Sequence, residues 1–220
     1  MPAAKKSVRQ VGRRPATPDA NLREQLLDVT VRLFAEHGIA GTTVARIAAA
    51  ASVTSAMVHY HFTHRESLLD AVADERLAPL ARYVWHDSDS DANDPIALIE
   101  RLIDRMFVVI VQSPWLPSLW LREVANTSGL LHQRMKARIP FDRIRELGDA
   151  LLQAQRAGRI NALVDPGMLF ISILGLVMLP FATATVWQGQ VGIATLDAVA
   201  LKRHVHALLL GACNPGHTPD

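Results

Sequence analysis

The polar side chains with the clearest chemical potential lie together between residues 54 and 65. His59, His61 and His64 carry imidazoles, which bind metal ions or form hydrogen bonds, and Tyr60 adds a phenol. On a helix, residues 59 and 61 point about 200° apart, so they cannot share one ion while that helix persists. No cysteine or Glu-x-x-His pattern nearby completes a metal site. We therefore expect contact with a binding partner or helix capping from these side chains, and no bound metal.

The surrounding sequence predicts two short helices joined by a tight turn. Thr42 or Thr43 can cap the first helix, and Thr54 or Ser55 can cap a second helix that runs to about His61. We expect the outward side of the second helix to carry small, hydroxyl, imidazole and phenol groups, from Ser55, Ala56, Met57, His59, Tyr60 and His61. A short helix with such a face fits a DNA major groove.

The motifs around these helices occur in a familiar order. They are LFAEHG at 33–38, TTV at 42–44, IA at 47–48, ASV at 51–53, VHYHF at 58–62 and RESLL at 65–69. In order and spacing they resemble the DNA-binding domain of the tetracycline-repressor (TetR) family of bacterial transcriptional regulators, from about Asn21 to Leu69. The chain departs from the family at Ser52, where glycine is usual, at His59, where an aromatic is usual, and at Arg65, where lysine is usual.

The resemblance implies an all-α protein that is not an enzyme and needs no cofactor. We expect a basic arm at residues 1–18, a helix-turn-helix DNA-binding domain at 19–68, and a helical effector-binding and dimerisation domain at 69–214. The fourth helix is expected to run to about Trp85, with a phosphate contact from Arg65 near its start. The expected DNA-binding residues are Arg13, Arg14, Thr43, Arg46, Thr54, Ser55, Ala56, Met57, His59, Tyr60, His61 and Arg65.

The basic charge of the chain is concentrated at its start. The 220 residues have a net charge of only +2, but residues 1–18 hold five lysines and arginines and no acid. The basic segment from Gly12 through Pro15 either enters a DNA minor groove or acts as a solubilising tail. The first residues lack an apolar signal region, and the single cysteine, Cys213, fits a reducing compartment, so we expect a cytoplasmic protein.

The central region is apolar and broken by prolines. No charge occurs between Met106 and Leu121, and Pro114 and Pro117 predict two helices that meet at an angle. Such residues form either an ordinary core or the lining of a small-molecule site, and the resemblance favours a cavity for a small, largely apolar effector. The candidate effector-binding residues are Met106, Phe107, Ile110, Trp115, Leu119, Trp120, Arg122, Glu123 and Met178.

The last third of the chain contains two candidate interface helices. The stretch that begins at Gly167 and ends at Trp187 has no charge, but Pro180 divides it and no basic cluster flanks it, so a membrane span is disfavoured. A helix buried on all sides in so small a domain predicts a partner subunit. With the helix from Leu196 to Leu210, it is expected to form a homodimer interface. An amphipathic helix pair is expected at 130–159, split near Pro140.

The preferred interpretation is a dimeric transcriptional regulator, a repressor that leaves a near-palindromic DNA operator when its effector binds. Two other classes remain open. One is a DNA-binding architectural protein without an effector, in which the apolar centre is only core. The other is a metal-dependent hydrolase that uses His59 and His61, which lacks a second set of ligands in the sequence.

Overall fold

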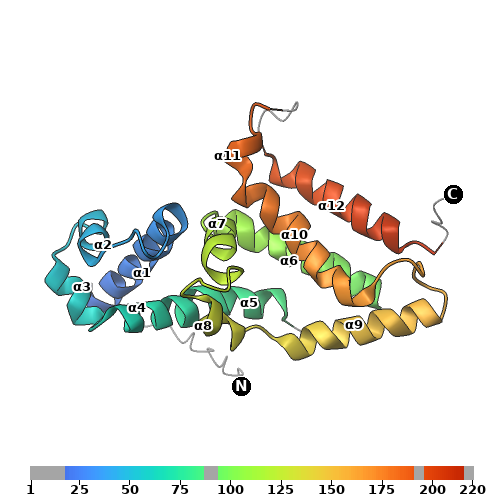
Figure 1. Ribbon diagram of the computed structural model, residues 1–220, viewed down its shortest axis with the longest axis horizontal. Coiled ribbons are helices and arrows are strands. Elements are labelled where there is room, and N and C mark those ends of the chain that lie inside the picture. Colours follow the sequence, from blue (N-terminus) through green and yellow to red (C-terminus); the bar gives the residue numbers. More distant parts are fainter. Residues whose placement is uncertain (1–17, 87–93, 191–195, 216–220) are drawn as a thin grey trace, which may run out of the picture.

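The computed structural model describes residues 18–86, 94–190 and 196–215, and all the regular elements in these ranges are helical. The expected all-α fold is therefore confirmed. Three helices form a small head at one end of the molecule (Figure 1): α1 (Pro18–His37), α2 (Val44–Ala50) and α3 (Ser55–His61). The arm residues Arg13 and Arg14 lie outside the described residues, as do residues 87–93.

A continuous helical rod connects the head to the rest of the protein. It consists of α4 (Arg65–Val72), the π-helical turn η1 (Ala73–Leu77) and α5 (Ala78–Val84), which follow one another along one edge of the molecule in Figure 1. A capping box starts the rod, because Ser67 N–H donates to His64 Nδ1 at 3.1 Å and His64 N–H donates to Ser67 Oγ. The expected fourth helix to about Trp85 is thus present, with one wider turn inside it.

The remaining helices form the body. They are α6 (Pro95–Gln112), α7 (Leu116–Leu119), the π-helical turn η2 (Trp120–Val124), α8 (His132–Lys136), α9 (Phe141–Arg156), α10 (Pro166–Ala182), α11 (Ala184–Trp187) and α12 (Ala198–Cys213). Asp94 caps α6 by accepting from the Ile96 and Ala97 N–H groups, and the predicted split near Pro140 separates α8 from α9.

Two apolar cores hold these elements together. The first begins in the head with Leu27, Phe34 and Val58 and continues without a break into α7 and the start of α8, at Leu119 and Leu131. The second joins α6, α9, α10 and α12. The head therefore shares its core with α7 and α8.

The turn between α2 and α3 has serine at a position whose backbone angle favours glycine. Ser52 has φ +57°, in the left-handed region where glycine is favoured and a Cβ is penalised. Thr43 caps α2 by accepting from Arg46 N–H at 3.2 Å, and Thr54 caps α3 by accepting from Met57 N–H at 3.4 Å. These caps place the second short helix where the sequence predicted it.

The uncharged helix α10 is only partly covered within one chain. Leu169, Ile173 and Val177 are buried, but Met168, Ile171 and Leu179 on its other side are each more than half exposed. In the part of the chain that the structure describes, no helix combines the length and the apolarity that a membrane crossing requires.

Candidate nucleic-acid interface and effector pocket

Helix α3 has one face in the head core and the other in solvent. Val58 is buried against the core, whereas Tyr60 is 70% exposed and Met57 is 38% exposed. Ser55, Ala56 and His59 are exposed as well. These five side chains form one continuous outward face, which we call the reading face.

His61 does not belong to the reading face, and the expectation that it points outward was wrong. Its side chain is only 4% exposed, with Nε2 3.5 Å from Asp19 Oδ1 of α1. The reason is helical periodicity: residue 61 lies three positions after the buried Val58 and therefore on the same side of α3. The Tyr60 ring packs edge-on against the His61 ring, with 5.1 Å between centroids. His61 thus contributes to the packing of α3 against α1.

Arg46 and Arg65 lie beside the reading face in different settings. Arg46 is exposed on α2, and its Nη1 donates to Gly41 O at 3.0 Å. Arg65 is half-buried, and its guanidinium donates to two backbone carbonyls of the loop before α2: to Thr42 O from Nη1 at 3.0 Å, and to Ile39 O from Nη2. Arg65 therefore fixes this loop to the start of α4, whatever further contact its remaining donors make.

Arg122 and Glu123 lie where η2 meets the end of α1, and neither lines the apolar cavity described below. Glu123 is buried, and its Oε1 accepts from Ile39 N–H at 3.0 Å. Arg122 Nη1 donates to Glu36 O, one of the carbonyls that the end of a helix leaves without a helical partner. A positive charge at a helix C-terminus is also favourable. These two side chains join the head to the body.

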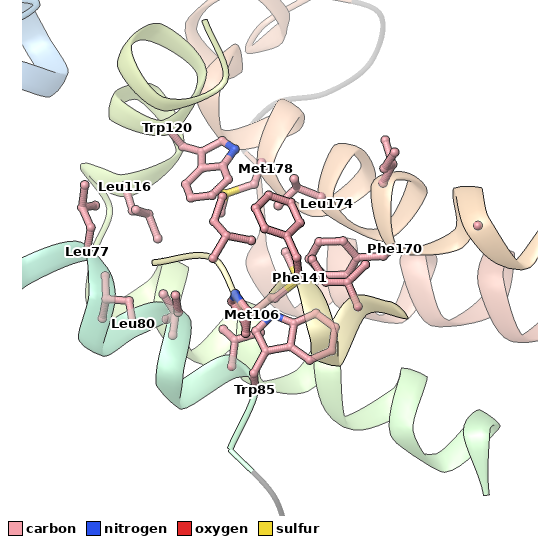
Figure 2. A pocket seen from close by; sticks show the side chains of 18 residues that line it. Leu77, Leu80, Trp85, Met106, Leu116, Trp120, Phe141, Phe170, Leu174 and Met178 are labelled. Atoms are coloured by element: carbon pink, nitrogen blue, oxygen red, sulfur yellow. The ribbon is translucent and has the colours of Figure 1, made fainter. Parts of the chain in front are cut away.

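An apolar cavity of about 310 Å³ lies between the rod and the body (Figure 2). The rod contributes one wall through Leu77, Leu80 and Trp85, and the start of α9 contributes another through Phe141. Helices α6, α7 and α10 and the turn η2 complete it. All eighteen lining residues are apolar or glycine, so the cavity suits a hydrophobic small molecule.

The cavity contains part of the predicted effector set. Met106, Trp120 and Met178 line it. Phe107 and Ile110 are packed in the second core, and Leu119 and Trp115 in or against the first. The prediction missed Leu77, Leu80, Trp85, Phe141 and Phe170. The leucine spacing on the rod was a detectable signal, but nothing local shows that Phe141 and Phe170 meet the rod.

Ion pairs hold the rod on both sides. Toward α1, Arg23 pairs with Glu75, and Arg76 pairs with Glu24 at 2.7 Å and Asp28 at 2.8 Å. Toward α8, Arg134 pairs with Glu66 and with Asp70, the latter at 2.7 Å, and Arg138 pairs with Asp74 at 2.7 Å. The hydrogen bond from Arg138 lowers the pKa of the Asp74 carboxyl below its usual value, as that from Arg23 does for Glu75. The rod is therefore tied to both head and body by charge as well as by packing.

A metal site is not formed by the histidines near α3. Within the ranges described, the structure contains no group of three or more His, Cys, Asp or Glu side chains arranged to hold an ion. His64 accepts the capping hydrogen bond described above, and His61 lies against α1.

Comparison with known proteins agrees with this geometry. The family described as "Bacterial regulatory proteins, tetR family" matches residues 26–72. The transcriptional repressor KstR2 of Rhodococcus jostii is 27% identical over 195 residues, covering 88% of this chain and 92% of that protein. The solved structure of the ketosteroid transcriptional regulator KstR2 of Mycobacterium tuberculosis has a TM-score of 0.70 at 23% identity, covering 87% of this chain and 94% of that one. AibR, solved with isovaleryl coenzyme A and operator DNA, has a TM-score of 0.63 at 22% identity, covering 85% and 97%.

The head, the reading face of α3 and the helical body define a helix-turn-helix transcriptional regulator rather than an enzyme. The head carries the DNA-binding domain of the tetR family of bacterial regulatory proteins, and the chain is similar to the transcriptional repressor KstR2 over most of its length.

Proposed function

We propose that this protein is a homodimeric repressor that binds a near-palindromic DNA operator and leaves it when an apolar effector enters the cavity. One observation carries the proposal: the rod that starts beside α3 also forms a wall of the cavity through Leu77 and Leu80. A molecule that fits the cavity better in one position of the rod shifts the equilibrium toward that position.

On DNA, each subunit would place α3 in the major groove of one half-site. Ser55 and His59 would hydrogen-bond to base edges, Ala56 and Met57 would touch thymine methyl groups, and Tyr60 would reach a phosphate or a base. Thr43, Arg46 and Thr54, all exposed at the starts of α2 and α3, would contact the flanking backbone. Arg13 and Arg14 would add salt-dependent attraction, in the minor groove or along the phosphates.

The second subunit would cover α10 and α12. Their exposed apolar side chains include Met168, Ile171, Leu179, Val199 and Leu208, and Val199 is 72% exposed. An apolar surface of this kind on two adjacent helices is typical of a dimer interface. The symmetry of a dimer would match the symmetry of a palindromic operator. The proposed place of action is the cytoplasm, where the DNA is.

Release by an effector is supported by the cavity and, at the level of the fold, by AibR, whose structure contains isovaleryl coenzyme A and operator DNA. That ligand is AibR's own. For this protein the lining supports an effector with a largely apolar body.

The test is a selection followed by a titration. Genomic fragments bound by the full chain would be enriched, and the best fragment titrated at two salt concentrations, with and without residues 1–18, against unrelated DNA of equal length. We expect a near-palindromic site, two chains per site, and weaker binding at higher salt. Addition of apolar compounds that raise the melting temperature of the protein should release the DNA. Folded protein that enriches no sequence, or that holds its site unchanged with a bound compound, would overturn the proposal.

A further inference from the structure

A second hollow adjoins the apolar cavity. It has a volume of about 410 Å³ and is lined by Arg82, Trp85, His86, Arg138, Pro140 and Arg143. Trp85 and Pro140 also line the apolar cavity, so the two hollows are neighbours across these two side chains. The end of α5 forms one side of the second hollow, and the segment between α8 and α9 forms the other.

Arginines are the main charged groups among the described residues that line the second hollow. Three of the six are arginines and one is histidine, and two of the arginines also pair with neighbouring carboxylates, Arg138 with Asp74 and Arg143 with Glu146. Helix α9 also begins here, after Pro140, which provides no side-chain cap, so its first backbone N–H groups lie beside the arginines; Asp142 stands in the same turn and pairs with Arg145. Planar guanidinium groups match the geometry of carboxylate and phosphate oxygens. The combined charge therefore favours a small anionic group.

The basic hollow is held in shape by contacts with the body. Arg105 of α6 donates to Val84 O at 3.4 Å and to His86 O, which fixes the end of α5. Arg138 is only 25% exposed, and it donates to Asp74 from Nε and to Arg134 O from Nη1. These bonds use two of the five N–H donors of the guanidinium and leave others to serve a ligand.

We propose that the two hollows form one site for an amphipathic anion, with its apolar body in the cavity and a carboxylate or phosphate group against Arg82, Arg138 and Arg143. The inference rests on the proposed function and names the chemical class of its effector. An uncharged hydrophobic compound would fill only half of this site.

A bound anion would also affect an ion pair of the rod. Asp74 stands on η1 and is the carboxylate that Arg138 holds at 2.7 Å. A ligand anion at Arg138 competes with Asp74 for the same guanidinium. Occupation of the site therefore weakens one of the ties between the rod and α8, so that ligand binding and the position of the DNA-binding head are coupled.

The test compares three ten-carbon probes that share one apolar chain: decanol, decanoate and decyl phosphate. Each is titrated into the full-length protein below its aggregation concentration, and binding is followed by calorimetry. We expect the better anion to bind about tenfold or more tighter than decanol, because charge-assisted hydrogen bonds to guanidinium groups are strong and the Arg138 side chain is only 25% exposed. The order of decanoate and decyl phosphate identifies the preferred anion.

Variants assign this preference to the basic hollow. Arg82 and Arg143 are both exposed, so Arg82→Gln with Arg143→Gln should leave the fold intact. This double variant keeps Arg138 and should lose most of the preference for the anions, with decanol affinity itself unchanged. Arg156→Gln, which removes one exposed arginine at the far end of α9, should change neither affinity.

The outcomes separate this inference from the proposed function. Equal affinity of the native protein for decanol and for both anions, or an anion preference that is undiminished in the double variant, would overturn the anionic site. DNA release by decanol alone would leave the proposed function intact in that case. Conversely, tight arginine-dependent anion binding without DNA release would uphold the site and overturn release by an effector.

Discussion

The reading face and the apolar cavity draw their residues from the chain in different ways. The reading face comes from one helix of seven residues, and its support comes from the two helices before it. The residues that line the cavity are spread between positions 77 and 178. They lie on seven helical elements and on the segment between α8 and α9. Local periodicity therefore describes the first region well and the second poorly. The two regions lie on different elements and are connected by the rod and by the contacts of α7, η2 and α8 with the head. We expect substitutions confined to one region to leave the other largely unchanged.

A substitution that fills the cavity should have the largest effect: it should impair ligand binding strongly and leave DNA binding nearly unchanged. Leu174 lines the cavity from α10, and Leu174→Trp would place an indole in the space that a ligand needs. We expect affinity for decanoate to fall at least ~100-fold, since the apolar burial of the ligand would be lost. Affinity for operator DNA should stay within about threefold of native. Calorimetry with decanoate and a DNA titration measure the two effects, and an equal loss in both would contradict the separation.

A substitution on the reading face should do the opposite: it should impair DNA binding and leave ligand binding unchanged. Tyr60→Ala removes the most exposed large side chain of α3 without touching the core. Operator affinity should fall about tenfold or more, because each good base or phosphate contact is worth about 1–3 kcal/mol. Decanoate affinity should not change. Tyr83→Ala, at a partly exposed tyrosine of α5, is the matched control and should leave DNA binding as it is.

The junction of head and body is the third point of comparison. Glu123→Ala would leave the Ile39 N–H without its acceptor in a buried position. We expect a loss of about 1–3 kcal/mol in the free energy of unfolding, measured in urea. Glu146→Ala, at an exposed residue of α9 paired with Arg143, should cost at most about 0.5 kcal/mol. A Glu123→Ala variant as stable as native protein, with decanoate binding impaired, would return Glu123 to the effector-binding set.

The ion pairs of the rod should make stability depend on pH in acid. The pKa values of Asp74 and Glu75 are lower in the folded protein than their usual values. The unfolded chain therefore binds more protons in this range, and stability is full above the usual carboxyl pKa of about 4 and falls as pH drops through the folded values. Asp74→Asn with Glu75→Gln should flatten the dependence of unfolding free energy on pH below about 4.5. A slope that is unchanged in the double variant would contradict this assignment.

The sequence predicted the head more completely than the body for physical reasons that particular residues show. Thr43, Thr54 and Ser52 act within four positions of themselves, and their roles follow from local rules. His61 was misplaced although Val58, three positions earlier, indicated its buried side. Trp85 and Phe170 meet in the cavity wall with ring centroids 5.0 Å apart, a contact between residues far apart in the chain that no local pattern contains.

The smallest expected effect tests whether local rules alone explain the turn in the head. Ser52 holds φ at +57°, and Ser52→Gly should stabilise the protein by up to ~1 kcal/mol, because glycine adopts this conformation without a Cβ clash. The same change at Ser172, an exposed position within α10, should instead destabilise by about 0.5 kcal/mol, since glycine is the poorer helix former. Opposite signs for the two variants in urea denaturation would confirm that the backbone angle decides the result. Destabilisation at both positions would show that the Ser52 side chain makes a contact worth more than the strain that it causes.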